Sequence, residues 1–443
     1  MPASHLDISI TPLRPALVDT DRPHLEVLVR IGVPANQSSS RTPLSVALVI
    51  DRSGSMRGSR LNAAKEATKQ FVNQLHADDE VSLVAYDESV SVPLNLMAVK
   101  NFKPLLPELL SSIDEGGSTN LHAGWLEGAQ QLAPRSGTDR MCRVVLLSDG
   151  KANAGIQNID TICEQVSHLA AAGVTTTTVG IGLDFNERLM TAMAIAGQGT
   201  AMYGDRASDL SEPLEAEAGL LSALSWREVS LKLQSESTRW TVHNPYSSHE
   251  PDTWILPSLA SNTEAWVALS IPMDCAVEAQ HASGNGSALS ISIRAKNTEG
   301  GVHAFEASLP ALPVISQVEY DAMTDDPMVR RRFDEIEAAD LQREAYRAAN
   351  QRNWSKISRM LDELELRARD NPWLMQTVTV MRQLLAEKDQ ARLEKELMYS
   401  SYSLSARLTE NGESLNFSES AESGKAAFLR RKIQQGRQSG SRE

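Results

Sequence analysis

Cysteine and long apolar runs are scarce in this 443-residue sequence. Its three cysteines, Cys142, Cys163 and Cys275, are an odd number without CxxC or metal-ligand spacing, which argues against a disulfide-stabilised secreted protein. No apolar run reaches the length needed to span a bilayer. The opening stretch, MPASHLDISITPL, lacks the basic and apolar regions of a signal peptide. We therefore expect a cytoplasmic protein with no membrane span.

Positive charge is also in deficit, because 43 lysines and arginines face 57 aspartates and glutamates. The resulting net charge of −14 argues against binding to nucleic acid or to an anionic membrane. We expect no nucleic-acid partner, and an acidic chain of this kind is suited to gathering cations.

Sequence motifs of several enzyme classes are missing. The chain has no HExxH string of zinc proteases, no GxxxxGK[ST] phosphate loop and no GxSxG nucleophile elbow. Among nine scattered histidines, His122 is the one expected near the candidate site described below. A polar role at a helix N-terminus fits His122 better than contact with a ligand. We therefore expect that the protein is not an enzyme.

Strand and helix patterns alternate between residues 43 and 221. Strands are predicted at 44–50, 80–86, 89–93, 142–147, 174–181 and 201–203, and helices at 60–75, 102–113, 121–133, 159–172, 186–195 and 208–221. The segment 89–93 is expected to be a short edge strand that Pro93 ends. This alternation predicts an α/β fold with a doubly wound, mostly parallel, Rossmann-like sheet flanked by helices.

Short strands with alternating polarity lie on both sides of that segment. They are predicted at 6–10 and 25–33 before it, and at 229–233, 240–242, 254–256, 266–270 and 289–293 after it. Two strands alone rarely form a stable sheet. We therefore expect residues 1–42 to join residues 222–313 in an antiparallel β-sandwich into which the α/β domain, 43–221, is inserted. Four tryptophans are expected in the sandwich core: Trp226, Trp240, Trp254 and Trp266.

Residues 314–399 have the periodicity of a C-terminal helical region. Helices are predicted from Pro327, over Trp354–Ala368, and from Pro372 to about Tyr399. The last helix is charged on nearly all sides over Glu387–Glu396, so this part is expected to project into solvent or to pair with a partner. Residues 400–443 are rich in Ser, Gly and Glu, end in a basic patch and are expected to be a disordered tail.

A candidate binding site follows the strand at 44–50. Asp51, Ser53 and Ser55 place three side-chain oxygens at alternate positions, Thr119 follows paired glycines before a helix, and Asp149 follows another predicted strand. Carboxyl ends of parallel strands open on one edge of a sheet, so these five side chains are expected to lie together. In the alternative, Thr119 caps a helix and Asp149 forms a turn.

These residues resemble the metal-ion-dependent adhesion site of von Willebrand factor type A domains. In that family a D-x-S-x-S motif is followed by a distant threonine and a distant aspartate, and Asp51, Ser53, Ser55, Thr119 and Asp149 fill these positions in the same order. The resemblance covers roughly residues 43–221. It implies that these five residues hold a divalent cation, and the flanking strands resemble bacterial proteins in which such a domain is inserted in a β-sandwich.

The chemistry of these ligands suits a hard cation such as Mg²⁺, with Mn²⁺ or Ca²⁺ as alternatives. Ser53, Ser55 and Thr119 would supply neutral oxygens, while Asp51 and Asp149 would contribute charge, partly through water, and orient the hydroxyls. Neutral ligands leave the ion with excess positive charge. An open coordination position would then attract a Glu or Asp carboxylate from a partner protein.

Three functions are compatible with these patterns. We favour a metal-dependent protein–protein interaction module. One alternative is a regulatory or assembly subunit that acts through its helical C-terminus beside an ATPase, kinase or channel. Another is a metal-dependent hydrolase, although no convincing base lies beside the motif. Asp87 and Asp114 could add to an acidic rim, but a structural role fits them better. The sequence leaves the partner and the oligomeric state open.

Overall fold

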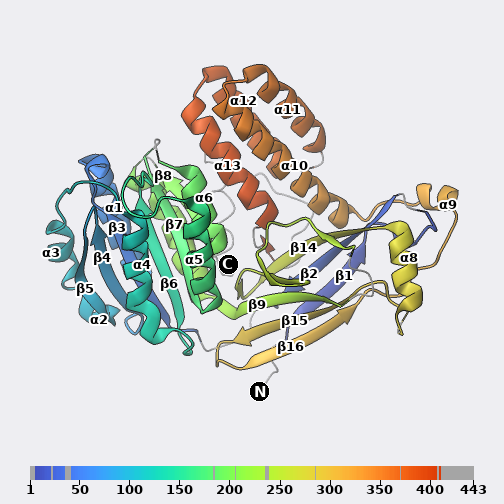
Figure 1. The fold of residues 1–443 in the computed structure, drawn as a ribbon, viewed down its shortest axis with the longest axis horizontal. Helices are drawn as coiled ribbons and strands as arrows, with labels where there is room; N and C mark the ends of the chain where they lie inside the picture. Colours follow the sequence, from blue (N-terminus) through green and yellow to red (C-terminus); the bar gives the residue numbers. More distant parts are fainter. Residues whose placement is uncertain are drawn as a thin grey trace, which may run out of the picture.

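The computed structural model describes residues 5–406, with gaps at 21–22, 35–40, 183–184, 205, 235–238, 285 and 370, together with residues 409–410. Figure 1 shows an α/β unit, a pair of antiparallel sheets and a helical region that lies against both. In the part of the chain that is described, no helix is both long and apolar enough to cross a membrane. The basic patch of the predicted tail lies outside the described residues.

A six-stranded sheet forms the centre of the α/β unit, in the order β5-β4-β3-β6-β7-β8. Its strands are β3 (Leu44–Asp51), β4 (Glu80–Tyr86), β5 (Val90–Ala98), β6 (Met141–Ser148), β7 (Val174–Ile181) and β8 (Gln198–Gly204). All neighbouring pairs are parallel except β4 and β5. Strand order runs outward in both directions from β3, which is the mixed, mostly parallel arrangement that the alternation of strands and helices predicted.

Helices α4, α5 and α6 cover one face of this sheet (Figure 1), and α1 and α7 pack against each other on the other face. The helices of the unit are α1 (Ser59–Gln74), α2 (Val99–Phe102), α3 (Leu106–Ser111), α4 (Leu121–Leu132), α5 (Ile159–Ala171), α6 (Glu187–Ala196) and α7 (Ala207–Ser222). Threonines of strand β7 form hydrogen bonds to helices on both faces of the sheet. Thr176 accepts a 3.0 Å hydrogen bond from the Trp125 indole of α4, and Thr177 donates one of 2.7 Å to Glu217 of α7. Successive side chains of a strand point to opposite faces, so each threonine has a partner on its own side.

The edge of the sheet at β5 differs from the prediction. Strand β5 continues through Pro93 to Ala98 instead of ending at the proline, and its register with β4 shifts on the way. Proline lacks an N–H to donate, which an edge strand tolerates. The helix predicted at 102–113 is shorter in the structure: α3 covers Leu106–Ser111 with Pro107 in its first turn, and the short α2 ends at Phe102, before Pro104.

Two antiparallel sheets make up the second part of the molecule. One has the order β1-β2-β14-β10, with β17 on β14, and the other has the order β11-β12-β9-β15-β16, with β13 on β9. The first contains β1 (Asp7–Pro12), β2 (His24–Gly32), β10 (Thr241–Val242), β14 (Thr263–Pro272) and β17 (Thr409–Glu410). The second contains β9 (Leu224–Gln234), β11 (Ser248–Glu250), β12 (Thr253–Ile255), β13 (Leu259–Ala260), β15 (Ser290–Asn297) and β16 (Val302–Ser308). Strand β2 precedes the α/β unit in the sequence, yet it pairs with β14, which follows that unit.

These two sheets share one hydrophobic core, to which β2, β9, β14 and β15 all contribute buried aliphatic side chains. Trp226 and Trp240 are buried in this core, and Trp254 packs against it. Trp266 was expected there too, but it faces the opposite side of β14 and packs against Phe333 of the helical region. Residues that alternate along a strand face opposite sides, and both faces of β14 are covered. Helix α8 (Met273–Ala282), which the sequence pattern did not predict, follows β14 directly.

Four long helices form the helical region: α10 (Pro327–Asn350), α11 (Trp354–Arg367), α12 (Pro372–Glu387) and α13 (Gln390–Ala406), preceded by the short α9 (Gln317–Asp321). The last predicted helix is therefore two helices. Lys388 adopts a left-handed backbone conformation with φ of 55° and ends α12. Helix α13 continues to Ala406, so residues 400–406, which were expected to begin a disordered tail, are helical.

The charged half of α13 contacts the α/β unit. Lys395 Nζ lies 3.3 Å from Glu187 Oε2 of α6, with the two side chains only 3% and 11% exposed. The Tyr346 hydroxyl of α10 donates to the other oxygen of Glu187 at 3.0 Å, and the Tyr203 hydroxyl of β8 donates to Glu396 at 2.9 Å. We call these five residues, Glu187, Tyr203, Tyr346, Lys395 and Glu396, the α13 joint.

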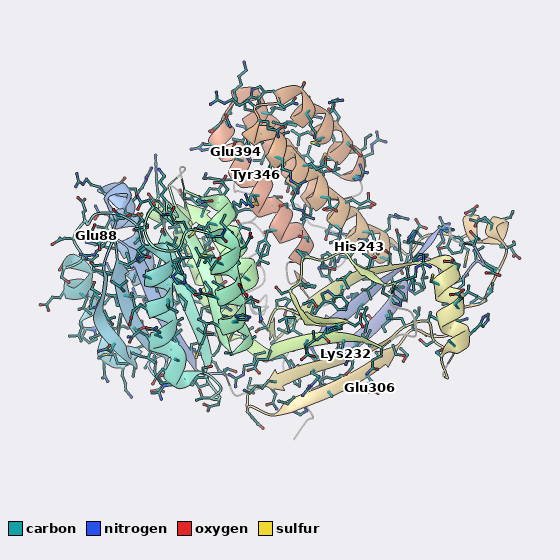
Figure 2. The ribbon with its side chains drawn as sticks, in the orientation of Figure 1. Glu88, Lys232, His243, Glu306, Tyr346 and Glu394 are labelled. Carbon is teal, nitrogen blue, oxygen red and sulfur yellow. The ribbon has the colours of Figure 1, made fainter. Side chains whose placement is uncertain are left out.

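The expectation that this charged segment projects into solvent or pairs with a separate partner is thus wrong for its buried residues, which pair within the chain. Figure 2 shows Tyr346 and Glu394 on helices of the C-terminal region that lie beside the α/β unit. A charged residue in a sequence carries no sign of whether water or a buried opposite charge will surround it. The pairing of α13 with α6 is decided by residues more than 200 positions apart.

Candidate functional site

The D-x-S-x-S motif begins at Asp51, the last residue of the central strand β3. Asp51 and Ser53 are fully buried. The backbone N–H of Ser53 donates to Asp51 Oδ1 at 2.9 Å, and the hydroxyl oxygens of Ser53 and Ser55 are 3.2 Å apart. The three side chains of the motif therefore form one connected polar group at the carboxyl end of the sheet.

The glycine pair before Thr119 packs directly on this motif. The backbone N–H of Gly54 donates to the Gly117 carbonyl at 2.9 Å, and the N–H of Gly116 donates to the Arg52 carbonyl at 2.7 Å. A Cβ atom at Gly116 would lie 1.8 Å from a carboxylate oxygen of Asp87. Only glycine at position 116 leaves room for that carboxylate, so the second loop can pack closely against the turn that follows β4.

The third loop, which follows β6, closes a ring of contacts. The Ser148 hydroxyl donates to Asp51 Oδ2 at 2.6 Å. The N–H of Thr119 donates to the Asn153 side chain at 2.7 Å, and the Asn153 N–H donates back to the Thr119 carbonyl at 3.1 Å. Each of the three loops thus contacts both others, as expected for loops at the carboxyl ends of neighbouring strands. Glu88, labelled in Figure 2, lies at the same edge of the sheet.

A cation that the sequence analysis missed joins Asp149 to the first loop. Arg60 Nη1 lies 3.5 Å from Asp149 Oδ2, and it donates to the Ser55 carbonyl at 3.1 Å. Asp51, Ser53 and Ser55 are thus joined directly, whereas Thr119 and Asp149 are linked to them through loop backbone and through Arg60. The only signal that could have revealed Arg60 is its place in the first turn of the helix after the motif.

The electrostatics of the site centre on two buried carboxylates. Burial raises the pKa of Asp51 to about 6, against an ordinary value of 3.8; hydrogen bonds from Ser148 and Ser53 act to lower it, and the charge of Asp149 acts to raise it. Asp149 is itself fully buried. A positive ion beside Asp51 would offset the cost of its burial.

The donor set fits a hard cation on chemical grounds. Two carboxylates and three hydroxyls offer only oxygen, which Mg²⁺ and Ca²⁺ prefer. Among the described residues, no group of three or more His, Cys, Asp and Glu side chains forms a metal site. A cation at these loops would therefore depend on the hydroxyls of Ser53, Ser55 and Thr119 as much as on the carboxylates. The assignment of Asp51, Ser53, Ser55, Thr119 and Asp149 as ligands stays a prediction.

The weaker candidates have structural partners. His122 Nε2 is 2.8 Å from the Gln165 side chain of α5, and His122 is buried. Asp87 is 3.1 Å from Arg52. Burial acts to raise the pKa of Asp87, but hydrogen bonds from Ser89 and the charge of Arg52 outweigh it and hold the pKa below its usual value. Asp114 is exposed.

Comparison with known proteins identifies the α/β unit. The family model of the von Willebrand factor type A domain matches residues 45–215. A solved structure described as von Willebrand factor type A from Catenulispora acidiphila has a similar fold, with a TM-score of 0.65 and 16% identity over 89% of this chain and 91% of that one. The chain therefore contains a von Willebrand factor type A domain, and its overall fold resembles that of the Catenulispora acidiphila protein.

Two relatives by sequence have no described function. An uncharacterized protein of Synechocystis sp. is 24% identical over 68% of this chain and 73% of its own length. The uncharacterized protein YfbK of Escherichia coli is 30% identical over 47% of this chain, and the match spans 36% of its length. Von Willebrand factor type A domains are commonly used for protein–protein interaction.

Proposed function

We propose that this von Willebrand factor type A domain is a metal-dependent protein–protein interaction module. In this proposal Asp51, Ser53, Ser55, Thr119 and Asp149 hold Mg²⁺, and the ion binds a Glu or Asp carboxylate of a partner protein. The observation that carries it is the closed ring of contacts among the three loops, which brings two buried carboxylates and a pair of serine hydroxyls to one edge of the sheet.

The chain's own residues explain why such an ion would still attract a carboxylate from a partner. Hydroxyl ligands are neutral, so they leave more positive charge on a cation than carboxylates do. Asp51 is already engaged by Ser53 and Ser148 through both of its oxygens. Its role would be to hold the Ser53 backbone and the Ser148 hydroxyl in place and to supply charge to the ion. Mn²⁺ and Ca²⁺ share these ligand preferences and are alternatives to Mg²⁺.

Calorimetric titration with Mg²⁺ tests the metal site. We expect saturable binding to the wild-type chain, none to Asp51→Ala, and unchanged binding to Asp114→Ala, an exposed carboxylate on the loop before Gly116. Wild-type protein that shows neither heat nor a thermal shift with Mg²⁺, Mn²⁺ or Ca²⁺ would contradict the proposal. A crosslinking pull-down with and without EDTA then tests whether partner capture needs the metal.

A second candidate function places the contact on the helical region, as in a regulatory or assembly subunit. Helices α11 and α12 lie on the side of that region away from the sheets (Figure 1), and Leu366 of α11 is 58% exposed. If this surface binds the partner, capture should survive EDTA and be lost in Leu366→Lys. The proposed metal-dependent contact predicts that capture is lost in EDTA and survives in Leu366→Lys.

We also propose an arrangement for the two antiparallel sheets, a cellular location and the absence of enzyme activity. The two antiparallel sheets would be a β-sandwich into which the von Willebrand factor type A domain is inserted, since β2 and β14 pair across that domain in the sequence. The protein would act in the cytoplasm as a binding protein and not as an enzyme. A screen for esterase and phosphatase activity with Mg²⁺ or Mn²⁺ tests whether the protein is an enzyme. Turnover that requires Asp149 would contradict the proposal that it is not.

A further inference from the structure

Arg60 occupies a position that ordinary helix energetics disfavours. It is the second residue of α1, whose N-cap is Gly58, and the first turn of this helix contains no acidic residue. The N-terminus of a helix carries a partial positive charge, so a cation there is repelled unless something nearby attracts it. The structure shows what attracts Arg60: the carboxylate of Asp149, which is fully buried.

The surroundings of Arg60 are shaped to hold its guanidinium at the site. One nitrogen donates to the Ser55 carbonyl at 3.1 Å and lies 3.5 Å from Asp149. Gly182, which follows β7, has a φ of 83°, and a Cβ atom there would lie 2.8 Å from Arg60 Nε. A glycine therefore satisfies a left-handed backbone and leaves room for the arginine at the same point.

From this arrangement we infer that Arg60 is an internal counter-cation of the metal site. It shares Asp149 with the divalent ion, so it weakens the binding of that ion. It also leaves the loaded site more positive: two carboxylates and one divalent ion cancel, and the guanidinium adds one positive charge. That charge favours the carboxylate of a partner. This inference rests on the proposed function, which it extends to a residue outside the five expected ligands.

A purely structural role for Arg60 makes the opposite prediction. If the arginine only braces Ser55 against Asp149, its removal should loosen the loops and weaken metal binding. If it acts as a competing cation, its removal should strengthen metal binding, because like charges at short range repel. The sign of the change in affinity therefore separates the two roles.

The test is calorimetric titration of the full chain with Mg²⁺ and with Mn²⁺ at pH 7.5 and low salt. Arg60→Gln keeps a polar amide side chain and removes the charge, and it should bind Mg²⁺ at least about tenfold more tightly than wild type. Arg60→Lys keeps the charge and should bind within about threefold of wild type. The matched control is Arg57→Gln, which removes a charge from the same loop where the side chain is 73% exposed and pairs with Glu115. It should change the affinity by less than about twofold.

The possible outcomes distinguish this inference from the function on which it rests. If wild type binds Mg²⁺ and a folded Arg60→Gln binds it equally or more weakly, the counter-cation role is wrong while the metal site stands. If only Arg60→Gln binds, the inference is supported. If neither protein binds any of the divalent ions, both proposals fail. Far-ultraviolet circular dichroism of each variant shows that the comparison is made between folded proteins.

Discussion

The metal-motif loops and the α13 joint both bury charged side chains, but their carboxylates have different partners. In the joint, Lys395 meets Glu187, which also accepts a hydrogen bond from Tyr346. In the loops, two buried carboxylates have one nearby guanidinium, at 3.5 Å from Asp149, and the pKa of Asp51 is raised. In the joint each carboxylate meets a donor from another part of the chain and stabilises that contact, whereas in the loops the raised pKa of Asp51 marks a carboxylate whose charge could serve a ligand. Mutations in the two regions should therefore have opposite effects on stability.

The largest effect is expected from Glu187→Ala in the joint. This change leaves Lys395 buried without its carboxylate and removes the acceptor of the Tyr346 hydroxyl. Removing one partner of a buried ion pair costs about 3 kcal/mol in free energy of unfolding. Urea denaturation measures the loss, and a double-mutant cycle with Lys395→Met should show that the second change costs much less once the first is made.

The control for this prediction is Glu164→Ala, which removes an exposed glutamate from helix α5 of the same domain. We expect it to change the free energy of unfolding by no more than about 0.5 kcal/mol. A Glu187→Ala protein as stable as this control would show that the joint does not hold α13 to the domain.

An intermediate effect of opposite sign is expected from Asp51→Asn without metal. The pKa of Asp51 in the folded protein is about 6, above its ordinary value of 3.8, so the ionised carboxyl destabilises the fold. This cost is absent below about pH 4, develops as the pH rises to about 6, and remains above that. In EDTA at pH 7.5, Asp51→Asn should gain about 2 kcal/mol over wild type, and it should lose stabilisation by Mg²⁺.

Asp87→Asn is the matched control at the same edge of the sheet. In the wild-type protein the pKa of Asp87 is held below its usual value, so the ionised carboxylate stabilises the fold at neutral pH. That contribution disappears as the pH falls through the folded-state pKa of Asp87. We expect Asp87→Asn to lower the melting temperature at pH 7.5. Equal shifts of the same sign for both variants would refute the contrast between them.

The smallest effect is expected at Lys388, between α12 and α13. Its left-handed backbone, with φ of 55°, favours glycine at the end of a helix. Lys388→Gly should raise the free energy of unfolding by about 0.5 kcal/mol. Gln383→Gly, at an exposed position inside α12, should lower it by about 1 kcal/mol. A loss of stability in both variants would mean that Lys388 is not strained.

Features set by local residue order could be predicted from the sequence. The aliphatic run before Asp51 indicated a buried strand of a parallel sheet, and β3 is that strand. The loops of Thr119 and Asp149 were expected beside Asp51 because parallel strands end at one edge, and hydrogen bonds do join these loops there. The coordination of an ion by these residues stays a prediction, because contacts among loops do not by themselves define ligands.

Features set by distant contacts were missed for physical reasons. Arg60 was missed because its one signal, a place in the first turn of the helix after the motif, does not show which side chain the arginine will meet. The fate of α13 was misjudged because Lys395 and Glu396 meet Glu187 and Tyr203 only after the chain has folded. Trp266 matched a core strand in its polarity pattern, but a helix that follows much later in the sequence covers the other face of β14.

By itself, the sequence determined the α/β alternation, the polar loops at the strand ends and the domain family, because periodicity and turn chemistry are properties of neighbouring residues. Only the tertiary structure decided where α13 docks, which of the later strands β2 pairs with, and that a guanidinium lies beside Asp149. These depend on the pairing of charges and strands between distant segments, and a linear pattern carries no record of which buried charge will meet which.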